Sequence, residues 1–299
     1  MVNLPQEIDV VVIGGGVMGA SAAFHLAEAG VSVVLIEKNE LASGSTSKAA
    51  GGVRANFSDE LNVAMGARSL DLLADFPNRP GQEIDLHRPG YLFALSTTED
   101  VTAFEAATKI HHKFGVESRM ITPQEAKELN PLLEIDGILA ASFTPNDGYC
   151  TPESVVLGYA SGARKHGAVI LTQTEATDIT VVDGKIVSVT TSAGTVKTST
   201  VINCGGAWSP TIGAMVGLEI PVKPLRRELL ITEPLTEDFA DVPDNMPMTI
   251  DYSTSLYWHR EGNAMLMGFS DKSAEYGFDL KRDPKFPEKI GELAYERAP

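Results

Sequence analysis

The residues whose spacing could do chemistry begin with three glycines near the start of the chain. Gly14, Gly16 and Gly19 form a Gly-x-Gly-x-x-Gly motif directly after the apolar run at residues 8–13. In such a motif the first glycine permits a sharp turn, the second lets the backbone approach a pyrophosphate, and the third lets a helix pack closely on a strand. Unpaired N–H groups at the start of that helix would stabilise the phosphate charge. The predicted dinucleotide contacts are Gly14, Gly16, Val17, Met18 and Gly19.

An acidic residue follows at the distance that dinucleotide binding requires. Glu37 comes directly after the apolar run at residues 31–36, where its carboxylate is placed to accept a hydrogen bond from a ribose hydroxyl. A carboxylate at this position would repel the 2′-phosphate of NADP, so NADP is disfavoured. The neighbouring Lys38 is included among the predicted contacts. The alternative is a structural glycine turn with a solvated Glu37.

The loop after this acid favours FAD over NAD. Residues 41–52 are rich in Gly, Ser and Ala, and they stand where a nicotinamide dehydrogenase usually begins another crossover. Hydroxyl and bare N–H groups in such a loop could run along a diphosphate and a ribityl chain toward a flavin ring. The predicted contacts in this loop are Ser45, Thr46, Ser47, Gly51 and Gly52. A flexible surface loop is the alternative.

The elements that would position these groups form one β-α-β unit. The run at residues 8–13 predicts a buried strand, residues 17–29 predict a helix that stops at Gly30, and residues 31–36 predict a parallel strand beside the first. Together they would place the glycine turn and Glu37 at one end of a parallel sheet.

Helices and strands alternate along the rest of the chain. Further helices are predicted at residues 59–75, 98–114, 122–130 and 151–166, and further strands at 90–96, 168–172, 175–182, 185–191 and 197–203. The third of these helices opens with a capping box of Thr122 and Glu125 around Pro123. Asp183-Gly184 predicts a hairpin turn. Beyond Pro221 the sequence predicts a second, β-rich sheet.

Composition excludes several classes of protein. The 299 residues are 43% hydrophobic and 21% charged, as in an ordinary globular protein, and the length predicts two lobes. The formal net charge of -16 disfavours nucleic acid and anionic lipid as partners. The sequence shows neither a membrane-length apolar run nor a signal-peptide cleavage site, so we expect a cytoplasmic protein. Cys150 and Cys204 form no CxxC pair, and no metal site is predicted.

Five segments resemble the D-amino-acid-oxidase-like superfamily of flavoproteins, and within it the branch of sarcosine oxidase beta subunits. The resemblance is carried by VVIGGGVMGASAAFHLAEAGVSVVLIEK, GSTSKAAGGVRANFS, GYCTPESVVLGYASGARKHGA, VINCGGAWSPTIGAMVGLEIPVKPLRRELLITEP and YWHREGNAMLMGFSD. It implies an α/β fold with a Rossmann-like FAD-binding domain, built on a parallel sheet with helices, and an α+β substrate domain with a mostly antiparallel sheet. We expect the FAD-binding domain at residues 1–85 and 150–215, and the substrate domain at 86–149 and 216–299.

The resemblance implies FAD as the cofactor and oxidation of a C–N bond by hydride transfer to the flavin. A small amino acid or secondary amine similar to sarcosine or proline would be the substrate, with oxygen or a carrier protein as electron acceptor and with room for partner subunits. Ala176 would contact adenine, whereas Gly205, Gly206 and Trp208 would approach the diphosphate and the flavin. Two alternatives stay open: an FAD-dependent 2-hydroxy-acid dehydrogenase, and a non-catalytic flavoprotein subunit or assembly factor.

Arginine and tyrosine side chains in the matching segments are the candidates for the substrate site, because a bidentate guanidinium suits an amino-acid carboxylate. The predicted catalytic residues are Arg54, Tyr257, His259 and Arg260, and the predicted substrate-binding residues are Tyr91 and Arg226. For any one arginine the alternative is a surface position. His259 is a candidate base, and its alternative is a structural role.

The end of the chain departs from the family pattern. Members of the family continue past the position equivalent to Pro299 with glycine-rich motifs that close over the flavin. We therefore expect a C-terminally truncated form that binds FAD weakly and turns over poorly. The covalent flavin attachment of some members, through a histidine or cysteine near the loop, has no match between Ser43 and Arg54.

Overall fold

The computed structural model of the protein describes residues 3–236 and 242–299. Residues 1–2 and 237–241, which belong to the predicted domain ranges 1–85 and 216–299, lie outside the described residues. The chain divides into two compact units. Unit 1 comprises Met1–Ala49, Asp75–Asp85 and Thr151–Pro224, and unit 2 comprises Ala50–Ala74, Leu86–Cys150 and Leu225–Pro299. Residues 50–74 thus group with unit 2, and the division into cofactor and substrate domains stays a prediction.

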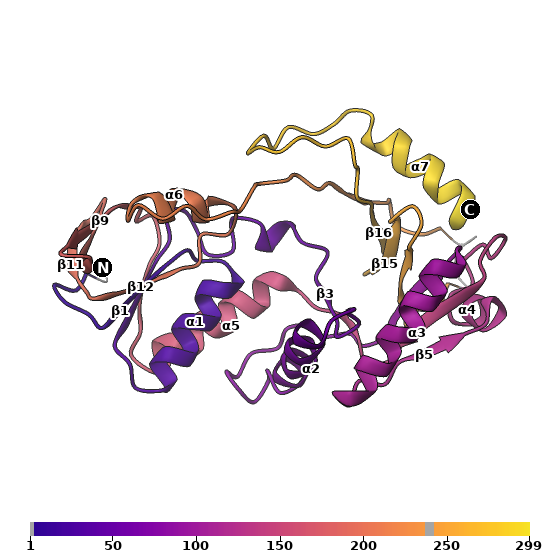
Figure 1. The fold of residues 1–299 in the computed structure, drawn as a ribbon, viewed down its shortest axis with the longest axis horizontal. Coiled ribbons are helices and arrows are strands. Elements are labelled where there is room, and N and C mark those ends of the chain that lie inside the picture. Colours follow the sequence, from indigo (N-terminus) through magenta and orange to yellow (C-terminus); the bar gives the residue numbers. More distant parts are fainter. Residues whose placement is uncertain (1–2, 237–241) are drawn as a thin grey trace. The chain divides into compact units, whose positions relative to one another are not determined.

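Unit 1 is built on a parallel sheet in the order β12-β1-β2-β8 (Figure 1). β1 (Val10–Ile13) pairs with β12 (Thr200–Asn203) and with β2 (Val33–Ile36), and β2 pairs with β8 (Val169–Leu171). Every residue of β1 and β2 is buried, as in a parallel sheet covered on both faces. The predicted β-α-β unit is confirmed.

Helices α1 (Val17–Glu28) and α5 (Pro152–Lys165) lie side by side in unit 1 (Figure 1). Phe24 of α1 is buried between them, with its ring centre 5.4 Å from that of Tyr159. A Cβ on Gly162 would lie 2.8 Å from the Phe24 ring, so this glycine lets the two helices approach. Helix α1, which follows the glycine turn, is thus packed against α5.

An antiparallel sheet completes unit 1, with strands β9 (Ala176–Val182), β10 (Lys185–Thr191) and β11 (Gly194–Lys197). Its hairpin turns at Asp183 (φ 51°) and Gly184 (φ 72°), as predicted. The strand predicted at 197–203 is observed as β12, but it begins only at Thr200. The chain leaves one sheet and enters the other there, and the Thr198 hydroxyl donates to the backbone oxygens of Asp9 and Thr200 at the crossing. Short helices η1 (Thr46–Lys48), η2 (Gly206–Trp208) and α6 (Ser209–Ala214) also belong to unit 1.

Unit 2 contains a seven-stranded sheet in the order β13-β16-β15-β14-β4-β6-β5. Its strands are β4 (Tyr91–Leu95), β5 (Arg119–Ile121), β6 (Ala140–Thr144), β13 (Leu229–Ile231), β14 (Met248–Asp251), β15 (Tyr257–Glu261) and β16 (Ala264–Gly268). Only β14 and β4 pair in parallel among these described strands. The predicted mostly antiparallel second sheet is confirmed.

The helices of unit 2 are α2 (Glu60–Ala74), α3 (Thr98–Lys113), α4 (Pro123–Leu129) and α7 (Phe286–Arg297). The capping box of α4 is confirmed, because the Thr122 hydroxyl accepts from the Glu125 N–H at 3.2 Å and the Glu125 carboxylate accepts from the Thr122 N–H at 2.9 Å. Helix α7 was not predicted in the β-rich region after Pro221. It buries Phe286 and Ile290 against a core that includes the fully buried Trp258.

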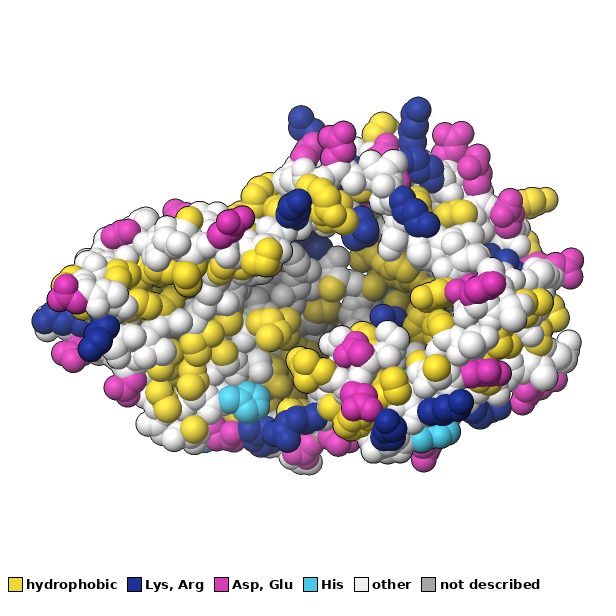
Figure 2. All heavy atoms as spheres, in the orientation of Figure 1, with side chains coloured by type: hydrophobic (Ala, Val, Ile, Leu, Met, Phe, Trp, Pro, Cys, Tyr) yellow, Lys and Arg dark blue, Asp and Glu magenta, His cyan; other side chains and the backbone are white. Residues whose placement is uncertain are grey.

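Strands β3 (Gly52–Val53) and β7 (Gly148–Tyr149) pair with each other in a separate two-stranded sheet of unit 2. On the face shown in Figure 2, acidic side chains are interspersed with lysines and arginines. Within residues 3–236 and 242–299, no helix is both long enough and apolar enough to cross a membrane.

Candidate functional site

The glycine motif forms the turn between β1 and α1. Gly14 has φ +114°, and a Cβ there would lie 2.3 Å from the carbonyl oxygen of Cys204. A Cβ on Gly19 would lie 1.8 Å from the carbonyl oxygen of Gly14. Any side chain at these positions would push the turn away from α1 and from the end of β12. The two glycines therefore keep the strand ends and the start of α1 in close contact.

The first turn of α1 faces the Ser- and Thr-rich loop. Gly16 is the N-cap and supplies no side-chain cap, so the first N–H groups of α1 can serve another acceptor. The Thr46 hydroxyl, from η1, accepts one of them from Val17 at 3.2 Å. Met18 is 70% exposed beside this turn. An oxygen-bearing group thus already sits where a diphosphate would meet the helix N-terminus.

Glu37 connects three segments at the end of β2. Its carboxylate accepts from the Gly15 N–H at 2.7 Å and from the Asn39 N–H at 2.8 Å. Its backbone oxygen accepts from the Thr174 N–H at 2.9 Å, which holds the approach to Ala176 beside it. The acid is therefore fixed beside the glycine turn, as a ribose contact requires.

Trp208 lies over the loop on the other side of the turn. The Lys38 ammonium is 5.0 Å from the centre of the indole. A Cβ on Gly44 would lie 3.8 Å from the Cζ3 atom of the same ring. Gly205, just before it, has no room for a side chain, because a Cβ would lie 2.4 Å from Ile212. Gly206 has φ +54°. The predicted cofactor contacts of unit 1 are thus grouped around the glycine turn.

The other predicted loop residues shape the loop backbone. Ser45 is the N-cap of η1, and the Ser47 N–H donates to the Ala42 oxygen at 3.1 Å. The Lys48 ammonium donates to the Gly44 oxygen at 2.8 Å. A glycine cradle that any Cβ would fill, an open helix N-terminus and a fixed acid together fit the ADP half of a dinucleotide.

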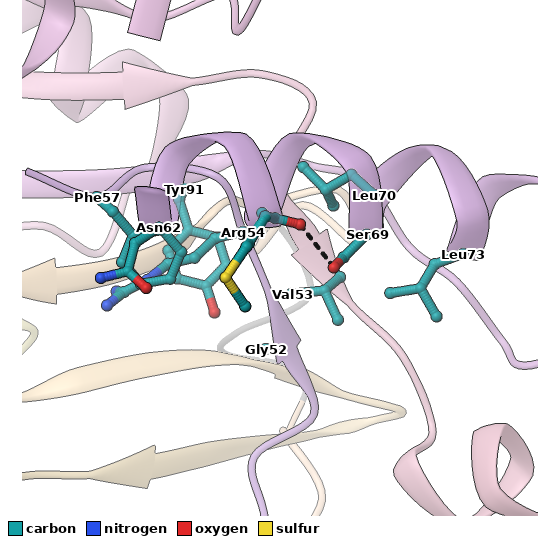
Figure 3. A pocket seen from close by; sticks show the side chains of 11 residues that line it. Gly52, Val53, Arg54, Phe57, Asn62, Ser69, Leu70, Leu73 and Tyr91 are labelled. Atoms are coloured by element: carbon teal, nitrogen blue, oxygen red, sulfur yellow. Dashed lines mark hydrogen bonds between the residues drawn. The ribbon is translucent and has the colours of Figure 1, made fainter. Parts of the chain in front are cut away.

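Unit 2 holds a pocket of about 500 Å³ between the segment after β3, helix α2 and the start of β4 (Figure 3). It is lined by Gly52, Val53, Arg54, Phe57, Asn62, Met65, Gly66, Ser69, Leu70, Leu73 and Tyr91. In Figure 3 the side chains of Arg54, Phe57, Asn62 and Tyr91 are grouped at one end of α2, and Leu73 marks the other. We call this the Arg54 pocket. The structure thus brings the predicted residues Gly52, Arg54 and Tyr91 together.

Aromatic rings surround the Arg54 guanidinium. Its central carbon lies 5.0 Å from the ring centre of Phe57, 5.4 Å from that of Phe93 and 5.7 Å from that of Tyr91. Within the described residues, no carboxylate forms an ion pair with Arg54. The half-buried charge is therefore held by rings and can take an anion from solution.

Tyr91 and Tyr257 belong to one apolar cluster beside this guanidinium. Burial raises the pKa of the Tyr91 phenol, which keeps it protonated. A Cβ on Gly52 would lie 1.9 Å from the Tyr91 hydroxyl, so Gly52 makes room for it. Burial also raises the pKa of Tyr257, against an opposing effect of Arg227. The sequence pointed to Arg226, whereas Arg227 is the arginine whose charge reaches Tyr257.

Arg226 and Arg260 are engaged elsewhere. Arg226 pairs with Glu228, at 3.2 Å between Nε and Oε1, and donates to the backbone oxygen of Lys281. Arg260 pairs with Asp244 at 2.8 Å. Neither lines the Arg54 pocket, and Arg226 instead lines a separate pocket of about 370 Å³ in unit 2.

His259 is fully buried in β15. Its Nδ1 lies 2.6 Å from the backbone oxygen of Arg260, its Nε2 lies 3.2 Å from that of Ala50, and its ring centre is 4.3 Å from that of Tyr149. Burial lowers the pKa of His259, so the imidazole is neutral near pH 7. These contacts are structural, and the role of a base stays a prediction.

Asp147 was missed by sequence reasoning. It lies between β6 and β7, is fully buried, and accepts hydrogen bonds from the backbone N–H groups of Ala55 and Asn56, next to Arg54. Burial raises the pKa of Asp147 to about 6. A single acid in a turn between short strands has no spacing pattern that would mark it. Within the described part of the chain, no group of three or more His, Cys, Asp or Glu could hold a metal.

The chain belongs to the family of FAD dependent oxidoreductases, whose model matches residues 9–299. It is 33% identical to dimethylglycine dehydrogenase, mitochondrial, of Rattus norvegicus over 265 residues, which cover 88% of this chain and 31% of that protein. It is 28% identical to sarcosine dehydrogenase, mitochondrial, of Mus musculus over 298 residues, covering 94% and 32%. The crystal structure of L-proline dehydrogenase from P. horikoshii superposes with a TM-score of 0.91 at 33% identity, covering 99% of this chain and 78% of that one.

These likenesses confirm the predicted family, its FAD cofactor and the predicted fold class. The chain spans about a third of the length of the two curated relatives. Both of those relatives are named as mitochondrial, so the cytoplasmic location expected from the sequence stays a prediction. The individual cofactor and substrate contacts are likewise predictions that the geometry makes specific.

Proposed function

We propose that the protein oxidises the C–N bond of a small amino acid or secondary amine and passes the electrons to FAD. The observation that carries the proposal is Arg54, a half-buried guanidinium backed by rings in a pocket large enough for such a substrate. Dimethylglycine, sarcosine and L-proline, which the relatives are named for, each carry a carboxylate next to an alkylated amine. A guanidinium can bind such a carboxylate through two parallel hydrogen bonds.

Each side chain of the Arg54 pocket has a distinct task in this proposal. Arg54 binds the substrate carboxylate, and the Phe57 ring excludes water from that ion pair, which strengthens it. The Tyr91 hydroxyl stays protonated because burial raises its pKa, so it can donate a hydrogen bond to the substrate. Bound FAD supplies the hydride acceptor. Positioning and desolvation, rather than a dedicated base, would then provide most of the catalysis.

The glycine turn of unit 1 is the proposed site for the ADP half of FAD. The α1 N-terminus and Thr46 would hold the diphosphate, Glu37 the ribose, and the strand start at Ala176 the adenine. The remaining proposed cofactor contacts are Gly14, Gly16, Val17, Met18, Gly19, Lys38, Ser45, Ser47, Gly51, Gly52, Gly205, Gly206 and Trp208. Substitution of Glu37 by Gln would test the ribose contact through the affinity for FAD.

The remaining catalytic candidates rank below Arg54 and Tyr91. Tyr257 shares their apolar cluster and is proposed as a second hydroxyl for the substrate. The structure adds no support for three further candidates, because each contacts other protein groups: Arg226, His259 and Arg260. They remain proposals that rest on the sequence. Oxygen or a carrier protein as the acceptor is also a proposal, which turnover in air with and without a redox dye would test.

Matched substrates test the proposed function. The FAD-loaded protein is assayed with a redox dye against three pairs of compounds: sarcosine and glycolate, L-proline and pyrrolidine, and N,N-dimethylglycine and trimethylamine. We expect turnover only with compounds that have both the amine and the carboxylate. Turnover of glycolate but not sarcosine would instead indicate a 2-hydroxy-acid dehydrogenase. Bound flavin with no turnover of any compound would favour a non-catalytic subunit.

A further inference from the structure

Arg54 begins a six-residue stretch, residues 54–59, that has no regular structure of its own. We call its first four residues, 54–57, which follow the end of β3, the Arg54 segment. A guanidinium on such a segment would be poorly placed for a carboxylate unless the backbone were fixed from outside. Helix α2 limits it on one side, because a Cβ on Gly66 would lie 2.8 Å from the Arg54 backbone oxygen.

Two buried side chains hold the backbone of the Arg54 segment. The Asp147 carboxylate accepts from the Ala55 N–H at 2.9 Å and from the Asn56 N–H at 3.4 Å. At the other end, the Nε2 of His111 in α3 lies 2.7 Å from the Phe57 backbone oxygen. The Asn56 amide also donates to the Thr144 hydroxyl at 2.8 Å. The segment is thus fixed by charged or polar groups from three other parts of unit 2.

Asp147 is itself held firmly. Its backbone oxygen accepts from the Gly90 N–H at 3.0 Å, and Arg88 donates to the preceding backbone oxygen, that of Asn146, at 2.7 Å. The next residue, Gly148, packs so closely that a Cβ would lie 1.9 Å from the His87 oxygen. The carboxylate therefore stands on a rigid turn.

The charges around Asp147 favour an ionised carboxylate at neutral pH. Burial raises its pKa, while the two backbone N–H groups and the charges of Arg54 and Arg88 lower it, with the result near 6. The Tyr91 phenol also senses the charge of Asp147, and burial keeps this phenol neutral. Burying a charge is costly unless other groups compensate it, and here the N–H groups of Ala55 and Asn56 do so.

We infer that Asp147 is a positioning residue: it fixes the backbone of the Arg54 segment so that the guanidinium is presented to the substrate carboxylate. This inference rests on the proposed function of Arg54 in carboxylate binding. It assigns Asp147 no contact with the substrate. A substitution of Asp147 should therefore change the affinity for a carboxylate only by changing how Arg54 is held.

A double-mutant cycle tests the inference in the FAD-loaded protein. Binding of cyclopentanecarboxylate, which has the carboxylate but no amine to oxidise, is measured by calorimetry for the wild type, Asp147→Asn, Arg54→Gln and the double variant. We expect Asp147→Asn to weaken binding about tenfold when Arg54 is present, and by less than about twofold when it is absent. Equal losses in the two backgrounds would overturn the inference, because they indicate a general structural role.

Two controls separate positioning from other effects. Cyclopentanecarboxamide, the neutral analogue, should bind the wild type and Asp147→Asn equally. Asp251→Asn removes another fully buried carboxylate of unit 2, which bonds Ser253 and Arg297 instead, and should leave carboxylate affinity unchanged. A loss with Asp251→Asn as large as that with Asp147→Asn would overturn the inference.

Two further outcomes separate a failure of the proposed function from a failure of the inference about Asp147. If Arg54→Gln alone leaves carboxylate affinity unchanged, the proposed function of the pocket fails, and the inference about Asp147 fails with it. If Arg54→Gln weakens binding but Asp147→Asn does not, only the inference fails. Should Asp147→Asn not fold, Asp147→Glu enters the same cycle, because it keeps the charge and displaces the carboxylate by one methylene. Its effect is again expected to vanish without Arg54.

Discussion

Arg54 illustrates how one side chain can be kept available for a ligand. Three aromatic rings support its guanidinium, and within the described residues no carboxylate forms an ion pair with it. Arg226 and Arg260, which the sequence also made candidates, both have acidic partners. At the scale of single residues, these ion pairs are the reason why we propose Arg54, and not Arg226 or Arg260, for the substrate carboxylate.

The first prediction concerns the availability of the Arg54 guanidinium for a ligand. Arg54→Gln should weaken apparent affinity for a carboxylate-bearing amine by about 10- to 100-fold, since a hydrogen-bonded charge contributes roughly 1.5–3 kcal/mol. Steady-state kinetics with sarcosine or L-proline measure this as a rise in KM. Arg68→Gln, on the exposed side of α2, is the control and should change KM little. A KM unaltered by Arg54→Gln would contradict the assignment.

The second prediction concerns the glycine turn. Gly14→Ala should destabilise the fold and weaken FAD binding, because a Cβ would overlap the Cys204 carbonyl at 2.3 Å. Gly167→Ala is a matched control: Gly167 also has positive φ, at +90°, but has open space at the Cβ position. Its free energy of unfolding should fall by only about 1–2 kcal/mol, the cost of the strained backbone. Urea denaturation with and without FAD measures both variants, and equal losses would refute the close-approach argument.

Residue-scale predictions from the sequence were limited by contacts between distant segments. The places of Gly14 and Glu37, after the first and the second strand, could be predicted because both belong to one continuous β-α-β unit. Asp147 could not, because it contacts the Arg54 segment across about ninety positions of sequence. Likewise no local pattern indicates that Arg260 pairs with Asp244.

At the scale of elements, the capping box of α4 gives a third prediction. Thr122→Ala removes the hydroxyl that accepts from the Glu125 N–H, and should lower the free energy of unfolding by about 1 kcal/mol. Thr122→Ser keeps the hydroxyl and should lose much less. Chemical denaturation followed by circular dichroism compares the two variants. A similar loss for both would show that the cap is not the cause.

Elements with a strong local signal were predicted well, and those set by tertiary packing were not. The apolar runs of β1 and β2 and the turn at Asp183-Gly184 carry their own periodicity and turn chemistry. The chain at 197–203 reads as one strand, yet Thr198 and Ser199 join the ends of two strands that belong to different sheets. Helix α7 depends on burial of Phe286 and Ile290 against distant residues.

At the scale of the whole molecule, Asp147 makes stability depend on pH. Its pKa is about 6 in the folded protein and 3.8 as the ordinary value, so between these pH values the folded protein holds a proton that the unfolded chain has lost. The free energy of unfolding contributed by this group therefore falls as pH rises through this window, by up to about 3 kcal/mol.

The fourth prediction compares Asp147→Asn with the wild type. Urea denaturation from about pH 4 to about pH 7 should show a difference in the free energy of unfolding that changes in the variant's favour as pH rises. Carboxylates with lowered pKa values, such as Asp271 beside Lys289, titrate in both proteins and cancel in the comparison. A difference independent of pH would mean that folding does not raise the pKa of Asp147.

The central claim is that the chain, loaded with FAD, oxidises a small amine that carries a carboxylate. The most direct measurement is the visible absorbance of the flavin during anaerobic titration with sarcosine, L-proline and glycolate in turn. We expect the flavin bands to bleach with sarcosine or L-proline and to persist with glycolate. Flavin that binds but keeps its absorbance with both amines would contradict the claim.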